Sequence, residues 1–299
     1  MHNKKNKSQI LKTLKNLNLV DEKNIEVFSK HTRDNNKLKV FKDKKSGVIF
    51  IDDYYVGINE YMDGKYKAKL VPKIKTTKRI FEENIDSIRR VKKYTQFVAD
   101  KDICDFGCGS GEFLKRIQPY ANKIYGVEPQ NDLNIKLNDN KIKCYHSISE
   151  FNNLIDVFFL FHSFEHLPNP METLKIMYKN LKKKEKGRIV IEVPHANDFL
   201  INNLSIVSFI KFTLWSQHLI LHTRESLKIF LQAAGFRNIS IEGVQRYNIA
   251  NHINWLRYDK PSGHKEILSI LESEDLKDAY SNALSRIDAN DTLVAIAST

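Results

Sequence analysis

The sequence predicts an α/β fold with a doubly wound, mostly parallel sheet, preceded by a small α+β extension. Two observations lead to this prediction. From residue 101 onward, short apolar runs alternate with helical stretches, as in successive βαβ units. The segment DFGCGSGEF (residues 105–113) also follows the first of these apolar runs, as a tight turn between a strand and a helix would.

The first hundred residues predict a unit of mixed structure. Apolar side chains at helical spacing indicate a short helix within residues 8–20. Two strands are expected within residues 38–56, on either side of a turn at residues 44–47. A longer helix is predicted over residues 72–98. We place the end of the basic N-terminal extension at residue 84, so that the domains span residues 1–84 and 85–299.

The rest of the chain supplies the sheet and the helices that cover it. Helices are expected at residues 111–121, 169–184 and 225–236, and a helical insertion at residues 264–287 precedes the last strand. Strands are predicted at residues 102–106, 123–128, 142–146, 155–162, 188–194, 237–244 and 291–298.

The composition is that of a globular protein with an uneven charge. The 299 residues have a formal net charge of +12. Residues 1–100 contain 24 lysines and arginines against 13 acidic residues, so nearly all of the excess lies there. This region could contact nucleic acid, membrane headgroups or an anionic substrate, or it could be an ordinary solvated surface.

Membrane, secretory and metal-rich classes are disfavoured. The longest apolar candidate, residues 199–215, is interrupted by polar side chains, and MHNKKNKSQ is followed by no apolar signal region. Cys104, Cys108 and Cys144 are too few and wrongly spaced for a disulfide framework or a zinc site. We therefore expect no membrane span, no metal and a cytoplasmic location.

The glycine-rich turn favours a nucleoside ligand. Gly107 and Gly109 permit backbone conformations that a Cβ would prevent, and Gly111 opens the next helix. The spacing is G-x-G-x-G, whereas the dinucleotide fingerprint is G-x-G-x-x-G, and Glu112 would face a pyrophosphate unfavourably. Glu128, at the end of the second strand, is well placed to bind ribose hydroxyls. A nicotinamide oxidoreductase is therefore disfavoured.

Together these features resemble the class I S-adenosylmethionine-dependent methyltransferases. The matching segments, within residues 85–299, are DFGCGSGEF, GVEP, FFLFHSFEHLPNP, GRIVIEVPH and ESLKIFLQAAGF. The resemblance implies a Rossmann-like, seven-stranded sheet whose last strand, residues 291–298, is antiparallel beside residues 237–244. It also implies S-adenosyl-L-methionine as the cofactor and S-adenosyl-L-homocysteine as the product.

The same resemblance assigns cofactor-binding positions. The glycine-rich turn would surround the methionine part, Glu128 would hold the ribose hydroxyls, and Pro129 would pack near the adenine. Residues 146–149 would pass the adenine edge, and residues 161–164 would lie beneath the methyl group. The cofactor-binding residues implied in this way are Asp105, Gly107, Cys108, Gly109, Gly111, Glu128, Pro129, Ser147, Phe161 and His162.

Within this class, FHSFEHLPNP and IEVPH are most similar to methyltransferases that act on sugars or sugar nucleotides. WSQHLILHTRESL resembles their histidine-bearing segment before the last helix. Those relatives often begin with a zinc module that contains C-x-x-C-G, whereas Asp43 and Ser46 stand here at the cysteine positions. The resemblance implies a degenerate zinc module and a small anionic acceptor, a sugar or nucleotide-linked metabolite of capsule or surface polysaccharide synthesis.

Methyl transfer to a hydroxyl or carbon requires removal of a proton, by a histidine or a carboxylate. Glu165 and His166 could instead cap or hold the adjoining loop. His218 and His222, four residues apart, could share a helix face as metal ligands, but no third ligand is evident in the sequence. The candidates at the carboxyl ends of strands and in the segment that follows are Glu165, His166, Glu192, His195, His218 and His222.

Acceptor recognition is predicted in residues 245–265, which are dense in polar and aromatic groups. Arg246, Asn248 and His252 are the candidates there, since arginine suits phosphate or carboxylate. The alternative is a helical cover that packs Trp255 and Leu256 on the sheet. Tyr55 is a further candidate, because the tyrosines of the extension could form a lid over the cofactor or the core of a small unit; these are Tyr54, Tyr55, Tyr61 and Tyr66.

Two other functions remain open at this point. An RNA methyltransferase would explain the basic region, but the chain has HSFEHL where base-modifying enzymes often carry N-P-P-Y, and it lacks a regular aromatic–basic array. The other alternative is a non-catalytic partner protein that keeps the fold and either binds the cofactor or has lost it. The intact glycines and Glu128 make loss of cofactor binding the less favoured case.

Overall fold

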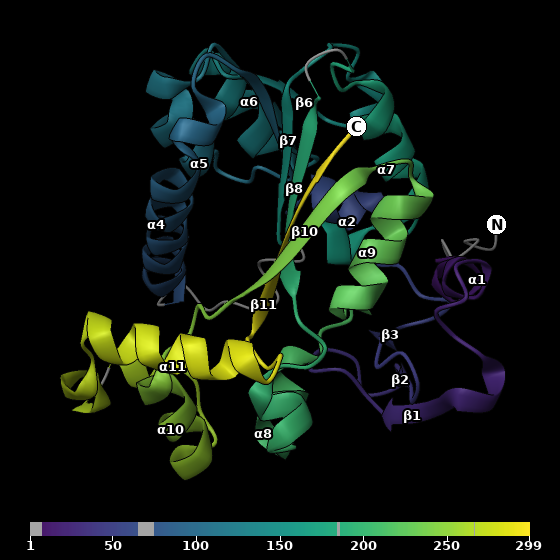
Figure 1. Cartoon of the computed structure of the whole chain (residues 1–299), viewed down its shortest axis with the longest axis vertical. Coiled ribbons are helices and arrows are strands. Elements are labelled where there is room, and N and C mark those ends of the chain that lie inside the picture. Colours follow the sequence, from purple (N-terminus) through teal and green to yellow (C-terminus); the bar gives the residue numbers. More distant parts are fainter. Residues whose placement is uncertain (1–7, 65–74, 184–185, 266) are drawn as a thin grey trace.

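The computed structural model describes residues 8–64, 75–183, 186–265 and 267–299, and it contains the predicted sheet (Figure 1). The strand order is β10-β11-β8-β7-β4-β5-β6. Neighbouring strands are parallel except at β11, which is antiparallel to both β8 and β10. The predicted fold class is confirmed. The strands are β4 (Asp102–Phe106), β5 (Lys123–Val127), β6 (Lys143–Tyr145), β7 (Val157–Phe161), β8 (Arg188–Pro194), β10 (Arg237–Val244) and β11 (Thr292–Ser298).

Alternation of side chains along the central strands separates two hydrophobic cores. In β7, Phe158 and Leu160 face one core, while Phe159 and Phe161 face the other, as the period of two along a strand requires. Helices α4 (Lys75–Tyr94), α5 (Glu112–Ile117) and α6 (Asn131–Asp139) cover the second face, and α7 (Pro170–Lys179) and α9 (Arg224–Ala233) cover the first (Figure 1).

The N-terminal extension contains the predicted helix and strand pair, now α1 (Ile10–Asn16), β2 (Val40–Asp43) and β3 (Ile49–Phe50). Two short strands that we did not predict, β1 (Ile25–Ser29) and β9 (Ile220–Leu221), complete a sheet of order β1-β2-β3-β9.

This second sheet therefore combines the extension with the chain that precedes α9. Ile10 and Leu14 of α1 also belong to the core on the α7 and α9 face. The boundary that we expected at residue 84 falls inside α4, which starts at Lys75, and residues 72–74 of the predicted helix lie outside the described ranges.

The turn between β2 and β3 is closed by the Asp43 side chain. Its Oδ1 accepts the backbone N–H of Lys45 at 2.9 Å and of Ser46 at 2.8 Å, and its Oδ2 accepts the N–H of Asp21 at 3.1 Å. Gly47 follows with a φ of +74°, in the left-handed region. Backbone hydrogen bonds to one carboxylate therefore hold the turn that we expected at residues 44–47.

Helices α8 (Val207–Thr213), α10 (Ile249–Tyr258) and α11 (Glu274–Arg286) gather at the lower end of Figure 1, where the parallel strands end. The predicted insertion over residues 264–287 contains α11 and a 3₁₀ turn at Ile267–Leu271. Short α2 (Ile58–Met62) lies in the extension. No helix in the described ranges is both long enough and apolar enough to span a membrane.

Candidate active site

The glycine-rich turn lies between β4 and α5, and two of its glycines are required for different reasons. Gly107 has a φ of +75°, and a Cβ there would lie 2.2 Å from Oγ of Ser163, on the loop after β7. Gly109 has a φ of +56°, and a Cβ there would meet no atom of the described chain within 4 Å. The turn therefore packs closely against the β7 loop on one side and borders open space on the other.

Glu128 connects this turn to the loop after β5. The residue is 4% exposed, its Oε2 accepts the N–H of Gly109 at 2.8 Å, and its Oε1 accepts the N–H of Gln130 at 2.9 Å. Asp105, at the end of β4, is also buried, and its Oδ1 has no hydrogen-bond partner in the described part of the chain. Burial, reinforced by the charge of Glu128 and opposed by Arg90, raises the pKa of Asp105 to about 7.

The other implied cofactor residues take varied positions. Cys108 lies in the turn, and a hydrogen bond with Cys144 together with burial raises the pKa of its thiol well above the usual range. Ser147 caps a 3₁₀ turn by accepting the N–H of Ser149 at 3.3 Å. Phe161 packs edge-on against Phe113, with ring centroids 4.9 Å apart, and is buried in the core. Pro129 is partly exposed beside Glu128.

A buried ionic network lies where β7 and β8 end. Glu192 is fully buried, and its Oε1 lies 2.8 Å from Arg89, 2.6 Å from Arg90 and 3.3 Å from Nε2 of His162. Burial alone would raise the pKa of Glu192, but these cationic neighbours hold it well below its usual range.

Arg246, predicted to bind the acceptor, forms an ion pair with Asp86 of α4. Asp86 also binds Arg89, which in turn contacts Glu192. Arg246 therefore extends the buried network from the end of β10 to α4, and its position does not support the predicted contact with the acceptor.

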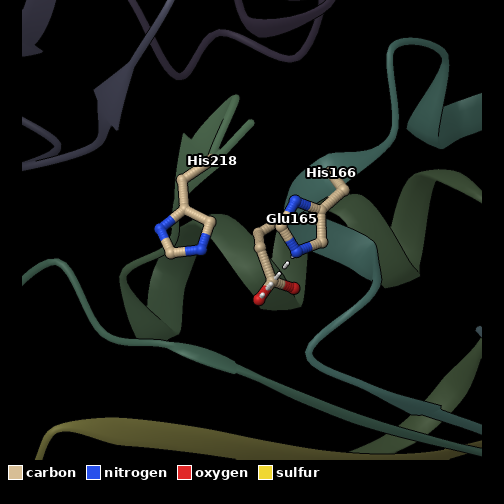
Figure 2. A group of neighbouring side chains, drawn as sticks. All are labelled: Glu165, His166 and His218. Carbon is tan, nitrogen blue, oxygen red and sulfur yellow. Dashed lines mark ion pairs between the residues drawn. The ribbon is translucent and has the colours of Figure 1, made fainter. Parts of the chain in front are cut away.

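Three of the predicted catalytic residues, Glu165, His166 and His218, meet at one place (Figure 2). Glu165 and His166 belong to a 3₁₀ turn at Phe164–His166, directly after Ser163, and His218 comes from the segment between α8 and β9. The N–H of Leu219 donates to the carbonyl of Glu165 at 2.8 Å, which ties the two segments together. Nε2 of His166 lies 3.9 Å from Oε1 of Glu165.

The pKa values of the side chains at this cluster differ from those of the free amino acids. Burial would raise the pKa of Glu165, but the neighbouring imidazoles, His162 first, lower it to about 2. Burial and nearby His166 lower the pKa of His218 to about 3, although Glu165 opposes the shift. His162 has a left-handed φ of +51° and lies between Glu165 and Glu192, whose carboxylates raise its pKa despite burial.

His195 and His222, also proposed as bases, lie outside this cluster. His222 is 0% exposed, stacks on Phe164 and accepts or donates a hydrogen bond at 3.1 Å with Ser226. His195 is 1% exposed and donates from Nδ1 to the carbonyl of Asn290 at 3.0 Å. The pair His218 and His222 shares no helix face, because the chain between them runs into β9. His222 packs between Phe164 and Phe230, whereas Nε2 of His195 lies 3.8 Å from Oδ2 of Asp288.

The remaining acceptor-binding candidates also have internal roles. Asn248 caps α10 by accepting the N–H of Asn251 at 3.2 Å. His252 is buried between Phe199 and Tyr280, whose hydroxyl lies 2.8 Å from its Nδ1. Residues 249–258 thus form a helix, as the alternative expected, with Trp255 buried against Phe209 and Phe212 of α8, whereas Leu256 is exposed. Tyr55 stacks on Tyr61 and packs against the main core, and Tyr66 lies outside the described residues.

Two residues beside the cluster were missed by the sequence analysis, Arg33 and Trp215. The Trp215 ring lies 5.6 Å from the His218 ring and 6.0 Å from the His166 ring. Arg33 is exposed, and its Cζ lies 4.8 Å from the ring centroid of Phe212 and 5.5 Å from that of Trp215. No spacing pattern could reveal Arg33, because it reaches the site through contacts between distant parts of the chain.

The packing role of His222 predicts a specific dependence of stability on pH. Burial lowers the pKa of His222 to about 4, whereas an unfolded histidine has a pKa of about 6.5. The unfolded state therefore binds more protons, and stability is lost as the pH falls from about 6.5 to 4. We expect His222→Phe to retain methyl transfer and to reduce the loss of unfolding free energy between pH 7 and pH 4 by about 3 kcal/mol.

Urea denaturation at the two pH values measures this difference. His31→Phe, on the loop after β1 where the imidazole is only partly buried, is the matched control and should keep the wild-type pH dependence. An unchanged pH dependence in His222→Phe, or loss of activity in a fully folded variant, would contradict the packing role.

The chain resembles known proteins in sequence and in fold. The sequence profile of the methyltransferase-domain family matches residues 76–241. Among solved structures, the chain is similar to the putative methyltransferase that forms a complex with the Haloferax volcanii Trm112 methyltransferase activator (TM-score 0.50, 12% identity, 79% of this chain and 96% of that chain). It is also similar to the magnesium protoporphyrin IX methyltransferase of Synechocystis PCC 6803 with bound SAH (TM-score 0.50, 8% identity, 80% and 96%).

A SAM dependent methyltransferase from Archaeoglobus fulgidus has a TM-score of 0.49 and 22% identity, and the match covers 74% of this chain and 98% of that chain. At these identities the likeness concerns the fold alone. Among curated proteins, none matches the sequence.

Proposed function

We propose, from the premise that the chain belongs to the methyltransferase-domain family, that it methylates a small anionic acceptor in the cytoplasm. The acceptor that we propose is a sugar, a sugar nucleotide or a related metabolite of capsule or surface polysaccharide synthesis. The observation that carries the proposal is the cluster of Glu165, His166 and His218, two of which follow Ser163, the residue that packs against Gly107 of the glycine-rich turn.

The residues around the turn fit S-adenosylmethionine, the cofactor of this fold, which when bound supplies an activated methyl group. The open space at Gly109 allows close approach of the methionine part to the backbone. Glu128 is buried and ionisable at the end of β5, where its carboxylate could exchange backbone partners for ribose hydroxyls. Asp105, whose Oδ1 has no hydrogen-bond partner among the described residues, lies near the carboxyl end of the neighbouring strand β4.

The cluster supports a reaction that requires removal of a proton. Nδ1 of His166 lies 2.8 Å from the carbonyl oxygen of Gln217, which can only accept, so the hydrogen resides on Nδ1 and the lone pair on Nε2. An acceptor hydroxyl at this Nε2 would lose its proton to the imidazole, and the ionised Glu165 would stabilise the resulting imidazolium. His218 offers a second imidazole on the other side of Glu165 (Figure 2). The chain's main task is otherwise to align the reactants and exclude water.

An exposed cation and an aromatic ring support the proposed acceptor class. Arg33 makes no ion pair with any described residue, and it lies on Trp215, which contacts both imidazoles of the cluster. The neighbouring carboxylate of Asp34 binds the N–H and hydroxyl of Ser216, at 2.9 and 2.6 Å. The Arg33 guanidinium is therefore available to a phosphate or carboxylate of the acceptor.

Transfer of tritium from labelled S-adenosylmethionine to a panel of nucleotide sugars and sugar phosphates tests the proposal. We expect transfer to at least one anionic sugar and weaker transfer by Arg33→Gln, with Arg257→Gln, on α10, as the matched control. No transfer to any member by a protein that binds the cofactor would contradict the acceptor class. Transfer to RNA would instead support the alternative suggested by the basic N-terminal third.

A further inference from the structure

The three side chains of the cluster present electron-pair donors to one another. One donor atom from each of Glu165, His166 and His218 lies within 4.8 Å of the other two. Glu165 has a fully buried side chain, and neither of its carboxylate oxygens accepts a hydrogen bond from a described residue. Figure 2 shows the carboxylate between the two imidazoles.

The ring orientations leave the same nitrogen available on both histidines. Nδ1 of His166 faces the carbonyl of Gln217 at 2.8 Å, and Nδ1 of His218 faces the carbonyl of Thr213 at 3.2 Å. Because a carbonyl only accepts, each Nδ1 carries the hydrogen and each Nε2 keeps its lone pair. Backbone carbonyls that bind the distal N–H in this way are typical of histidines that ligate metals.

We infer that Glu165, His166 and His218 form a binding site for one divalent transition-metal ion. Without a cation, two imidazole lone pairs and a carboxylate are left close together in a largely buried place, where unmatched donors are costly. His162 lies 3.4 Å from Oε1 of Glu165, but it is shared with Glu192, whose Oε1 lies 3.3 Å from its Nε2. A metal ion satisfies all three donors at once.

The ligand set selects the kind of ion. Two imidazoles and one carboxylate are the ligands of many catalytic zinc sites, and imidazole also suits iron, nickel and copper, whereas magnesium and calcium prefer oxygen ligands. Ligands at about 2.0–2.1 Å from a tetrahedral zinc ion lie about 3.4 Å apart. The donors therefore need to close by at most about 1.5 Å, through rotation of the carboxylate and small movements of the two imidazoles.

Three protein ligands leave at least one coordination position for another molecule. This part of the inference rests on the proposed function: the open position would take a hydroxyl oxygen of the acceptor. A metal there would orient that oxygen and lower the pKa of the hydroxyl, whose proton would pass to a water molecule, so that both imidazoles could remain ligands. The acceptor class is thereby narrowed to molecules that offer an oxygen ligand to the metal.

Calorimetric titration of chelator-treated, full-length protein with ZnCl₂ tests the site, and Co²⁺ absorption in the visible range reports the coordination. We expect one Zn²⁺ per chain. Glu165→Gln and His218→Ala should each weaken binding by more than the 10- to 100-fold that loss of a ligand-orienting hydrogen bond costs. Glu172→Gln, an exposed change in the first turn of α7, is the matched control and should bind Zn²⁺ as the wild type does. Circular dichroism and S-adenosylhomocysteine binding confirm that the variants are folded.

Absence of stoichiometric Zn²⁺ binding, or equal binding by the wild type and both ligand variants, would overturn the inference. Methyl transfer by the chelator-treated protein would then leave the proposed function intact. Conversely, Zn²⁺ binding that depends on Glu165 and His218 supports the site even if no sugar in the panel is methylated, so the two proposals fail separately.

Discussion

Glu165→Gln is expected to lower kcat for methyl transfer by about 10²- to 10⁴-fold, the usual contribution of acid–base catalysis by a positioned group. The substitution keeps the shape of the side chain and removes its charge. In the metal-free enzyme the ionised carboxylate stabilises protonated His166, and in the metal-bound enzyme it is a ligand. Both roles affect the reacting oxygen, so the loss should appear in kcat.

The affinity for S-adenosylhomocysteine separates this effect from misfolding. We expect it to change far less than kcat does in Glu165→Gln, because the described ion pairs of Glu165 are with His162 and His166 and not with the glycine-rich turn or Glu128. Glu172→Gln, an exposed change in the first turn of α7, is the matched control and should retain wild-type kinetics. A folded Glu165→Gln enzyme with wild-type kcat would remove the cluster from the catalytic mechanism.

Glu128→Gln is expected to weaken S-adenosylhomocysteine binding by about 100-fold. A hydrogen bond to a charged group contributes about 1.5–3 kcal/mol, and a glutamine amide retains only one accepting atom where the carboxylate has two. The substitution also turns an NH₂ group toward the N–H of Gly109 or of Gln130, which both need an acceptor. The effect should therefore fall on cofactor affinity and not on the chemical step.

Asp139→Asn is the matched control for Glu128→Gln, because it changes an exposed carboxylate at the end of α6 in the same way. Its affinity should equal that of the wild type in the same calorimetric titration. An affinity of Glu128→Gln within threefold of the wild type would show that Glu128 is structural only.

Much of the main sheet could be predicted because each strand has a strong local pattern. The limits of β8 and β10 match the predicted ones at every residue, since both are apolar runs bounded by charged or turn residues. Strand β9 was missed because two residues, Ile220 and Leu221, carry no periodicity of their own. They form a strand only because β3 of the distant N-terminal extension lies beside them.

The site shows the same division between local and long-range information. Position after a strand was enough to select Glu165 and His166, and the glycine spacing was enough to select the turn. Position after a strand was insufficient for His195 and His222, because the direction in which such a side chain points depends on the part of the chain that packs against it. His222 stacks on Phe164, whereas His218, four residues earlier, joins Glu165. Charge alone also could not reveal the ion pair of Arg246 with Asp86, which is 160 residues away in sequence.

Titration of the wild-type protein with S-adenosylhomocysteine is the most direct test of the central claim, that the turn at Gly107–Gly111 and Glu128 form the cofactor site. The account predicts one binding site per chain, with saturable heat and a rise in melting temperature as ligand is added. Absence of both heat and a thermal shift, in a protein whose circular dichroism shows the folded α/β structure, would contradict it.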